Sequence, residues 1–146
     1  MPKGDLRARA FLLDTHVWVW LMQGDPTLRR ARAVLSVLEQ AALEARLLVA
    51  AISVWEVGML ESKGRIVLPI DVMQWVERAL AAPGVRLQPL TPAIAVQSTR
   101  LPGGFHGDPA DRILVATARD RNATLVTRDE RILDYGATGL VNTLAV

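Results

Sequence analysis

Short, nearly unbroken apolar runs alternate along this chain with segments whose apolar residues recur at helical spacing. Runs of strand length occur at residues 11–13, 47–51, 124–127 and 140–144, with a weaker candidate at 85–90. Strands that are apolar on both faces belong inside a sheet, and a helix between successive strands supplies the crossover that parallel neighbours need. The pattern therefore predicts an α/β fold of three layers, α/β/α, around a central, mainly parallel sheet.

Start and stop signals define the helices between these runs. Asp25-Pro26 and Asp108-Pro109 pair a capping aspartate with a proline, which is favourable in the first helical turn. They predict a long helix from Pro26 to about residue 46 and a second helix over 110–121. We expect the remaining helices over 15–22, 53–62, 71–82, 92–100 and 130–135. We also expect a small edge arm at 65–68.

Composition limits the chain to one domain and excludes several classes of chemistry. Its 146 residues, 51% hydrophobic and 22% charged, have the size and balance of one compact domain. The absence of cysteine excludes disulfides, thiolate zinc sites and a cysteine nucleophile, and it fits the cytoplasm. The longest apolar stretch, 47–55, is shorter than the ~18 residues that span a bilayer, and the polar start predicts no signal peptide. We expect a cytoplasmic protein that does not contact membranes.

Carboxylates follow the carboxyl ends of several predicted strands. Asp14 directly follows the first strand, Glu56 lies one helical turn beyond the second, and Asp129 lies just beyond the fourth. Asp111 occupies the first turn of the helix predicted over 110–121. Because parallel strands bring their carboxyl ends to one edge of a sheet, we expect these four side chains to share one patch.

Four carboxylates at one place need a counter-charge. Two like charges ~4 Å apart repel by roughly 4 kcal/mol at an effective dielectric near ~20. An all-oxygen ligand set suits Mg²⁺ or Mn²⁺ better than zinc, and such an ion acidifies bound water and neutralises charge on a phosphodiester. The cluster thus favours metal-dependent phosphodiester hydrolysis. Helix capping is the alternative for Asp14, Glu56 and Asp111 taken singly, but it does not explain why several strand ends carry an acid.

The acids lie in four segments: LLDTHVWVWL, ISVWEVGML, HGDPADRILVATA and LVTRDERI. Their order, spacing and strand context resemble the four acidic motifs of PIN-domain nucleases, in the version found in VapC-type toxins of type II toxin-antitoxin pairs. The resemblance runs from about Phe11 to the C-terminus. It implies that Asp14 and Asp111 are catalytic residues that ligate Mg²⁺ directly, with Mn²⁺ as a possible substitute. It implies that Glu56 and Asp129 complete the catalytic quartet and act on the metal partly through water.

The same resemblance implies an activity and partners. It implies an endoribonuclease that hydrolyses RNA phosphodiesters, commonly in tRNA or rRNA, with a metal-activated water, and a homodimer that a cognate antitoxin blocks. A stand-alone RNA-processing nuclease and a catalytically inactive interaction module are alternatives. A receiver-like domain fits poorly, because it needs a lysine near the last strand and the lysines here are Lys3 and Lys63. Residues 1–10 are expected to be a basic extension, and 11–146 a single PIN-like domain.

Polar residues beside the acids are candidates for RNA contact. Arg112 and Arg128 stand next to two of the acids, where a guanidinium could bind phosphate, and solvated helix faces are the equal alternative. Thr15 and Thr127 also flank the acids and are candidates to orient a phosphate or a metal-bound water, with backbone capping as the alternative. Asp108 is an alternative ligand, although helix capping explains it better.

The aromatic residues divide into core and partner candidates. Trp18 and Trp20 stand two apart on one short apolar helix, so they cannot face the same way. We expect one of them outside the monomer core, in contact with a dimer partner or an antitoxin. Trp55 and Trp75 are expected in the core, and His16 in a loop or cap rather than in catalysis.

Overall fold

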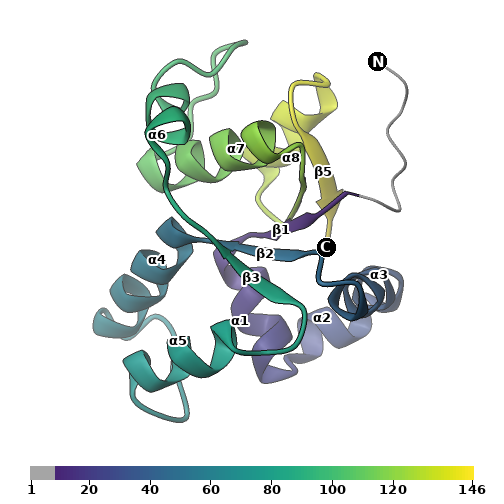
Figure 1. The fold of residues 1–146 in the computed structure, drawn as a ribbon, viewed down its shortest axis with the longest axis vertical. Coiled ribbons are helices and arrows are strands. Elements are labelled where there is room, and N and C mark those ends of the chain that lie inside the picture. The colour runs from purple at the N-terminus through teal and green to yellow at the C-terminus, as the bar shows by residue number, and fades with distance from the viewer. Residues whose placement is uncertain (1–8) are drawn as a thin grey trace.

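The computed structural model describes residues 9–146, which fold around one five-stranded sheet with the order β3-β2-β1-β4-β5 (Figure 1). Its strands are β1 (Phe11–Leu13), β2 (Leu47–Ala50), β3 (Val85–Gln88), β4 (Thr124–Thr127) and β5 (Asn142–Ala145). Every neighbouring pair is parallel. Lys3 and Arg7, and with them most of the predicted basic extension, lie outside the described residues.

Helices cover both faces of the sheet (Figure 1). One face carries α1 (Thr15–Gln23), α2 (Pro26–Arg30), α3 (Arg32–Leu43), α4 (Ala51–Ser62) and α5 (Val72–Leu80). The other face carries α6 (Pro92–Ser98), α7 (Pro109–Arg121) and α8 (Glu130–Ala137). The predicted three-layer α/β/α fold is confirmed. Within residues 9–146 no helix combines the length and the apolar character needed to cross a membrane.

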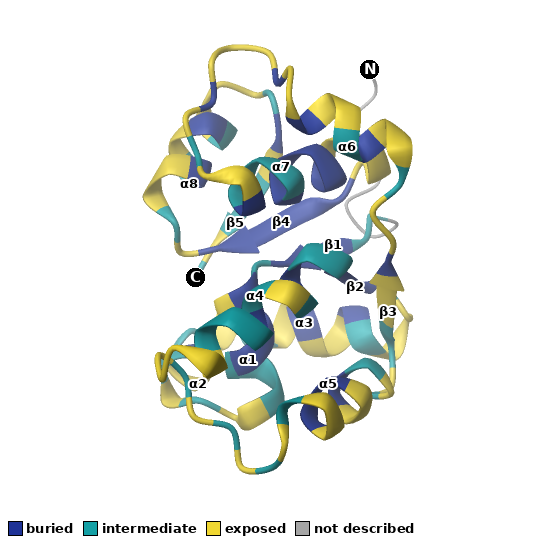
Figure 2. Cartoon of the chain, turned by 90° about the vertical axis from the view of Figure 1, so that its left-hand side faces the viewer, coloured by how far each residue is buried: buried dark blue, intermediate teal, exposed yellow. Residues whose placement is uncertain are grey.

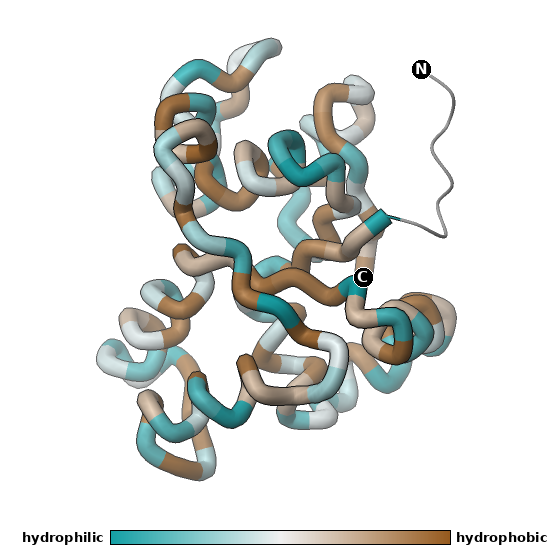
Figure 3. Tube along the Cα trace, in the orientation of Figure 1, coloured by the Kyte–Doolittle hydropathy of each residue, from teal (hydrophilic) through white to brown (hydrophobic). Residues whose placement is uncertain are grey.

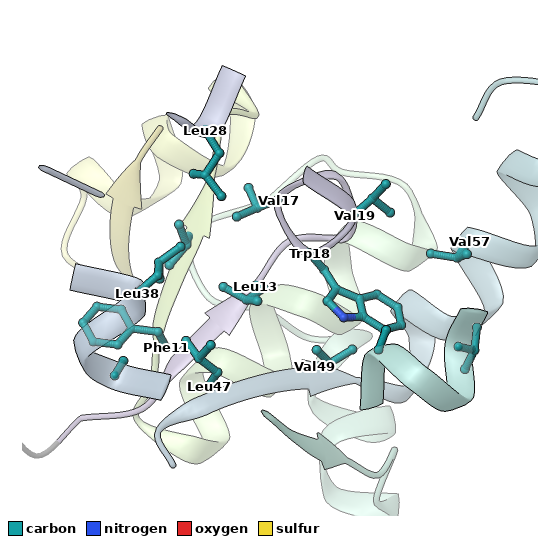
Figure 4. Packing of buried hydrophobic residues seen from close by; sticks show 14 of the residues in the cluster. Phe11, Leu13, Val17, Trp18, Val19, Leu28, Leu38, Leu47, Val49 and Val57 are labelled. Carbon is teal, nitrogen blue, oxygen red and sulfur yellow. The ribbon is translucent and has the colours of Figure 1, made fainter. Parts of the chain in front are cut away.

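Alternating strand side chains build two separate cores. Leu13 joins the core under α1–α5, whereas its neighbour Leu12 joins the core under α6–α8. Hydrophobic residues follow the central strands in Figure 3, and β4 is buried along its length in Figure 2. Figure 4 shows the Trp18 indole beside Val49 of β2, and this ring meets Trp75 edge-on with centroids 5.0 Å apart. The two cores fix the sheet between the helical layers, so its carboxyl edge is a rigid platform.

Several predicted elements differ locally from the structure. The long helix expected from Pro26 is two helices, because the backbone at Ala31 leaves the helical region (φ −85°, ψ 62°). The break lets Leu28 of α2 and Leu38 of α3 both reach the core. The segment at 65–68 forms no strand and pairs with no neighbour in the described chain. The last strand begins two residues later than predicted, at Asn142.

The strand order creates a switch point beside β1. The chain runs outward from β1 through β2 to β3, then returns to the other side of β1 with β4 and β5. Open α/β sheets leave a crevice beyond the carboxyl ends of the strands where the order reverses in this way. Asp14 lies at this point, and its N–H donates to the carbonyl of Val126 in β4 over 3.0 Å. The fold therefore directs a binding site to the residues that follow β1 and β4.

Candidate active site

A pocket of about 440 Å³ lies beyond the carboxyl ends of β1 and β4. The structure brings all four predicted acids into its wall, although they come from four separate parts of the chain. A fifth carboxylate, an arginine, a histidine and two apolar side chains complete the wall: Asp14, Glu56, Asp108, Asp111, Asp129, Arg128, His16, Val17 and Trp20. The pocket is thus strongly acidic, with one guanidinium at its side.

Asp14 is held at both carboxylate oxygens. Its Oδ1 accepts a hydrogen bond from the backbone N–H of Thr15 at 2.7 Å, which caps α1. Its Oδ2 accepts from the hydroxyl of Thr127, at the end of β4, at 2.6 Å. Burial raises the pKa of Asp14, while these two hydrogen bonds and the nearby His16 act in the opposite direction. The carboxylate is therefore fixed across the switch point and still faces the pocket.

Glu56 is positioned from α1 although it belongs to α4. Thr15 Oγ1 donates to Glu56 Oε1 over 2.8 Å and lies 2.9 Å from Ser53 Oγ. The alternative of a capping box does not hold, because the cap of α4 is Ala50 and no side chain bonds there. Burial raises the pKa of Glu56, and the negative charges of Asp14 and Asp108 add to the effect. Helix capping therefore does not account for Glu56, whose carboxylate lines the pocket.

Of the five carboxylates in the pocket, that of Asp111 has its negative charge least offset by hydrogen bonds. Its backbone N–H donates to the capping Asp108 at 2.8 Å, but within residues 9–146 no donor bonds its own carboxylate. Burial, followed by repulsion from the carboxylates around it, raises the pKa of Asp111 to about 7. Asp129, in contrast, caps α8 through Ile132 N at 3.1 Å. At neutral pH, Asp111 needs either a proton or a nearby cation.

The charges of the pocket suit a divalent cation. Across residues 9–146 the structure contains one ion pair, Arg46 with Glu44, and it lies outside the pocket. The guanidinium of Arg128 lies over the ring of Trp20, 5.5 Å from its centroid, instead of pairing with an acid. As they stand, no three His, Asp or Glu side chains of the described chain are close enough together to hold one ion. Magnesium keeps several of its water ligands when it binds a protein, so carboxylate oxygens spread around a pocket suit this ion chemically.

Three of the four candidates for RNA contact have hydrogen-bond partners within the described structure and do not face the pocket. Thr15 and Thr127 are buried, with 1% and 0% of their surface exposed, and their hydroxyls orient acids instead of facing a ligand. Arg112 lies outside the pocket wall, where its Nε donates to Ser98 O at 2.8 Å and its Nη1 to Phe105 O at 2.6 Å. It therefore anchors the loop before α7. Arg128 alone among these candidates is exposed at the pocket.

Two further residues of α1 line the pocket. His16 is expected in a loop or cap but lies within α1, and Trp20 is expected only as a partner contact. The signal for both was their position on the helix that Asp14 caps. Trp18 is fully buried and Trp20 is partly exposed, so the prediction that they face apart is confirmed. Trp75 is in the core as predicted, but the prediction for Trp55 is wrong, because 58% of its surface is exposed.

The chain belongs to the PIN-domain family, whose sequence model, described as PIN domain, matches residues 11–137. Over 124 residues it is 40% identical to Ribonuclease VapC22 of Mycobacterium tuberculosis, covering 85% of this chain and 90% of that protein. The predicted membership of the PIN family, in its VapC-type version, is confirmed.

Solved structures share the fold. DNA-bound VapBC from Salmonella typhimurium aligns with a TM-score of 0.62 at 15% identity, over 94% of this chain and 98% of that one. VapBC2 from Rickettsia felis, bound to a promoter DNA fragment, aligns with a TM-score of 0.64 at 16% identity, over 93% and 98%. At these identities the two structures establish the fold alone.

Proposed function

We propose that this protein is a Mg²⁺-dependent endoribonuclease, with Mn²⁺ as a substitute, and the toxin of a VapBC-type pair. The observation that carries the proposal is the meeting of five carboxylates in one pocket, with no ion pair to any of them in residues 9–146. Such a pocket attracts a divalent cation and, through it, a phosphodiester. The 40% identity to a protein named a ribonuclease supports RNA as the substrate.

Each acid has a role in this proposal. Asp14 and Asp111 would hold the ion directly, and Glu56 and Asp129 would act on it partly through water. A bound ion supplies positive charge against the phosphodiester and acidifies the attacking water. The chain's own contribution is orientation, because Thr127 fixes Asp14 by a hydrogen bond. Arg128 is exposed and lines the pocket, and in this proposal it would contact a phosphate of the RNA strand.

The partners follow from the same family. We propose tRNA or rRNA as the substrate, a cognate antitoxin that covers the pocket, a homodimer, and action in the cytoplasm by the single domain over 11–146. Structural neighbours solved as VapBC complexes support the antitoxin. A stand-alone RNA-processing nuclease of the same family is the alternative. Co-purification with the product of an adjacent reading frame distinguishes the two, since the stand-alone enzyme would have no such partner.

Cleavage of RNA with and without EDTA tests the proposal. We expect cleavage that EDTA abolishes and that Mg²⁺ or Mn²⁺ restores. Asp14→Asn and Asp111→Asn should each lower the rate by about 100-fold or more, the scale of losing one strong electrostatic contact to a transition state. Asp71→Asn is the matched control, because Asp71 caps α5 away from the pocket. Cleavage that persists in EDTA, or in both pocket variants, would refute the proposal.

A further inference from the structure

Trp55 is exposed beside the carboxylate pocket. It stands on α4 directly before Glu56, and 58% of its surface is accessible although it is a large aromatic residue. The buried side of α4 is formed by Ser53 and Val57, which explains why the indole between them faces outward. No packing role accounts for this side chain in the described structure.

A cavity of about 270 Å³ adjoins the indole, and we call it the Trp55 cavity. Glu56 and Asp108 line both this cavity and the carboxylate pocket, so the two hollows share a wall. Lys63 and Arg65 also line the Trp55 cavity. Both cations are exposed, and within residues 9–146 neither forms an ion pair. An indole, two acids and two cations without ion pairs in the described structure therefore border one cavity.

This arrangement matches the chemistry of one nucleotide. A base can stack on an indole whatever its identity, because every base has a π-face. A backbone phosphate beyond that base is attracted by lysine and arginine, whose counter-ions are released on binding. The phosphate on the other side of the nucleotide would lie at the carboxylate pocket. The cavity is small, and its wall combines apolar side chains, among them Met59 and Leu60, with charged ones. Such a wall suits a planar ring flanked by phosphates.

We propose that the Trp55 cavity is a nucleobase subsite, in which a base adjacent to the scissile phosphate stacks on Trp55 and the next phosphate contacts Lys63 and Arg65. The proposal rests on the proposed ribonuclease function and adds a positioning subsite to it. Stacking holds the substrate in both the ground state and the transition state, so it acts mainly on binding.

Steady-state cleavage of single-stranded RNA by Trp55 variants tests the subsite. Trp55→Ala should raise KM about 10-fold with little change in kcat, and Trp55→Phe should keep most of the affinity because it retains a ring. Leu43→Ala is the matched control, since Leu43 is 82% exposed at the end of α3, on the far side of the molecule from α4 (Figure 1). Equal KM values for Trp55→Ala and the unchanged protein would overturn the proposal.

Substrates with one abasic nucleotide identify the stacked base. In the proposed complex, one nucleotide next to the cleaved bond places its base in the cavity. Removing that base should raise KM for the unchanged protein but not for Trp55→Ala. Lys63→Gln should reduce the dependence of binding on salt concentration. If Trp55→Ala responds to every abasic substrate as the unchanged protein does, no base stacks on Trp55 and the proposal fails.

Binding without turnover separates this proposal from the proposed function. The fluorescence of Asp111→Asn should be quenched by single-stranded RNA, and the quenching should be largely lost when Trp55→Phe is added. If the unchanged protein cleaves no RNA, this measurement still decides, because Trp55-dependent quenching supports the subsite and its absence overturns it. Weaker binding of a co-purifying protein by Trp55→Ala, with unaltered RNA cleavage, would also overturn it and mark Trp55 as a protein contact.

Discussion

Asp111 is the residue on which the charge balance of the pocket depends most. In an unfolded chain an aspartate titrates near pH ~4, whereas burial and the surrounding carboxylates raise the pKa of Asp111 to about 7 in the fold. A raised pKa means that the folded state binds the proton more tightly than the unfolded state. The associated stability is present below about pH 4 and is lost as pH rises through about 7.

Asp111→Asn should therefore stabilise the metal-free protein at alkaline pH. In EDTA at about pH 8, we expect the variant to melt at a higher temperature than the unchanged protein, because it removes a repelled charge. The difference should shrink as pH falls from about 7 toward ~4, since the carboxyl of the folded protein then takes up its proton. Thermal melts at the two pH values measure this, with Asp71→Asn as the control. A variant that is less stable than the parent at pH ~8 would contradict the charge balance described above.

Thr127 tests whether orientation of Asp14 matters. Its hydroxyl donates to Asp14 Oδ2 and accepts from the N–H of Asp129, and Thr127→Val removes both bonds with little change of shape. We expect cleavage to fall by about 10-fold to 100-fold, as for loss of a group that orients a ligand, and Thr127→Ser to retain most activity. Thr99→Val, at the exposed C-cap residue that follows α6, is the control. Full activity in Thr127→Val would show that Asp14 needs no such support.

At the scale of elements, the sequence predicts the starts and ends of helices most clearly where local signals and burial agree. The cap at Asp108 and the proline after it correctly predict the start of α7, which positions Asp111. The break at Ala31 carries no such signal, because alanine favours helix and only tertiary packing ends α2 there. The prediction that Trp55 lies in the core is wrong for a related reason. Because α4 is apolar on most sides, the spacing of its apolar residues does not show which side faces the core.

The two tryptophans of neighbouring helices should differ sharply in their effect on stability. Trp18→Ala removes a fully buried ring that packs on Trp75, and we expect a loss of about 3–5 kcal/mol in the free energy of unfolding. Trp55→Ala removes an exposed ring and should change stability by less than about 0.5 kcal/mol. Denaturant titrations of both variants measure this difference. Similar losses in the two variants would contradict the burial described for α1 and α4.

At the scale of the whole molecule, topology brings the acids together. Parallel strands and their short helical connections were enough to predict that distant carboxylates converge, because every strand ends at the same edge. The hydrogen bonds that orient them could not be predicted, since Thr15 and Thr127 act across elements that are far apart in sequence. The sequence thus predicts the location of the site better than its internal geometry.

Divalent ions should stabilise the whole fold through this site. An ion that binds only the folded state raises its stability by about 2.7 kcal/mol at a concentration of 100 times Kd. We expect Mn²⁺ and Mg²⁺ to raise Tm more at alkaline than at acidic pH, because a pKa of about 7 leaves the Asp111 carboxyl mostly protonated at acidic pH. Melts with and without each ion measure the effect. An equal shift in Asp14→Asn would show that the ion binds elsewhere.

Anomalous diffraction from crystals soaked in Mn²⁺ tests the central claim most directly. The account predicts a manganese peak in the pocket between the carboxylates of Asp14 and Asp111, which disappears in crystals of Asp14→Asn. Diffraction that shows these two carboxylates without manganese between them, at a concentration that supports RNA cleavage, would contradict it.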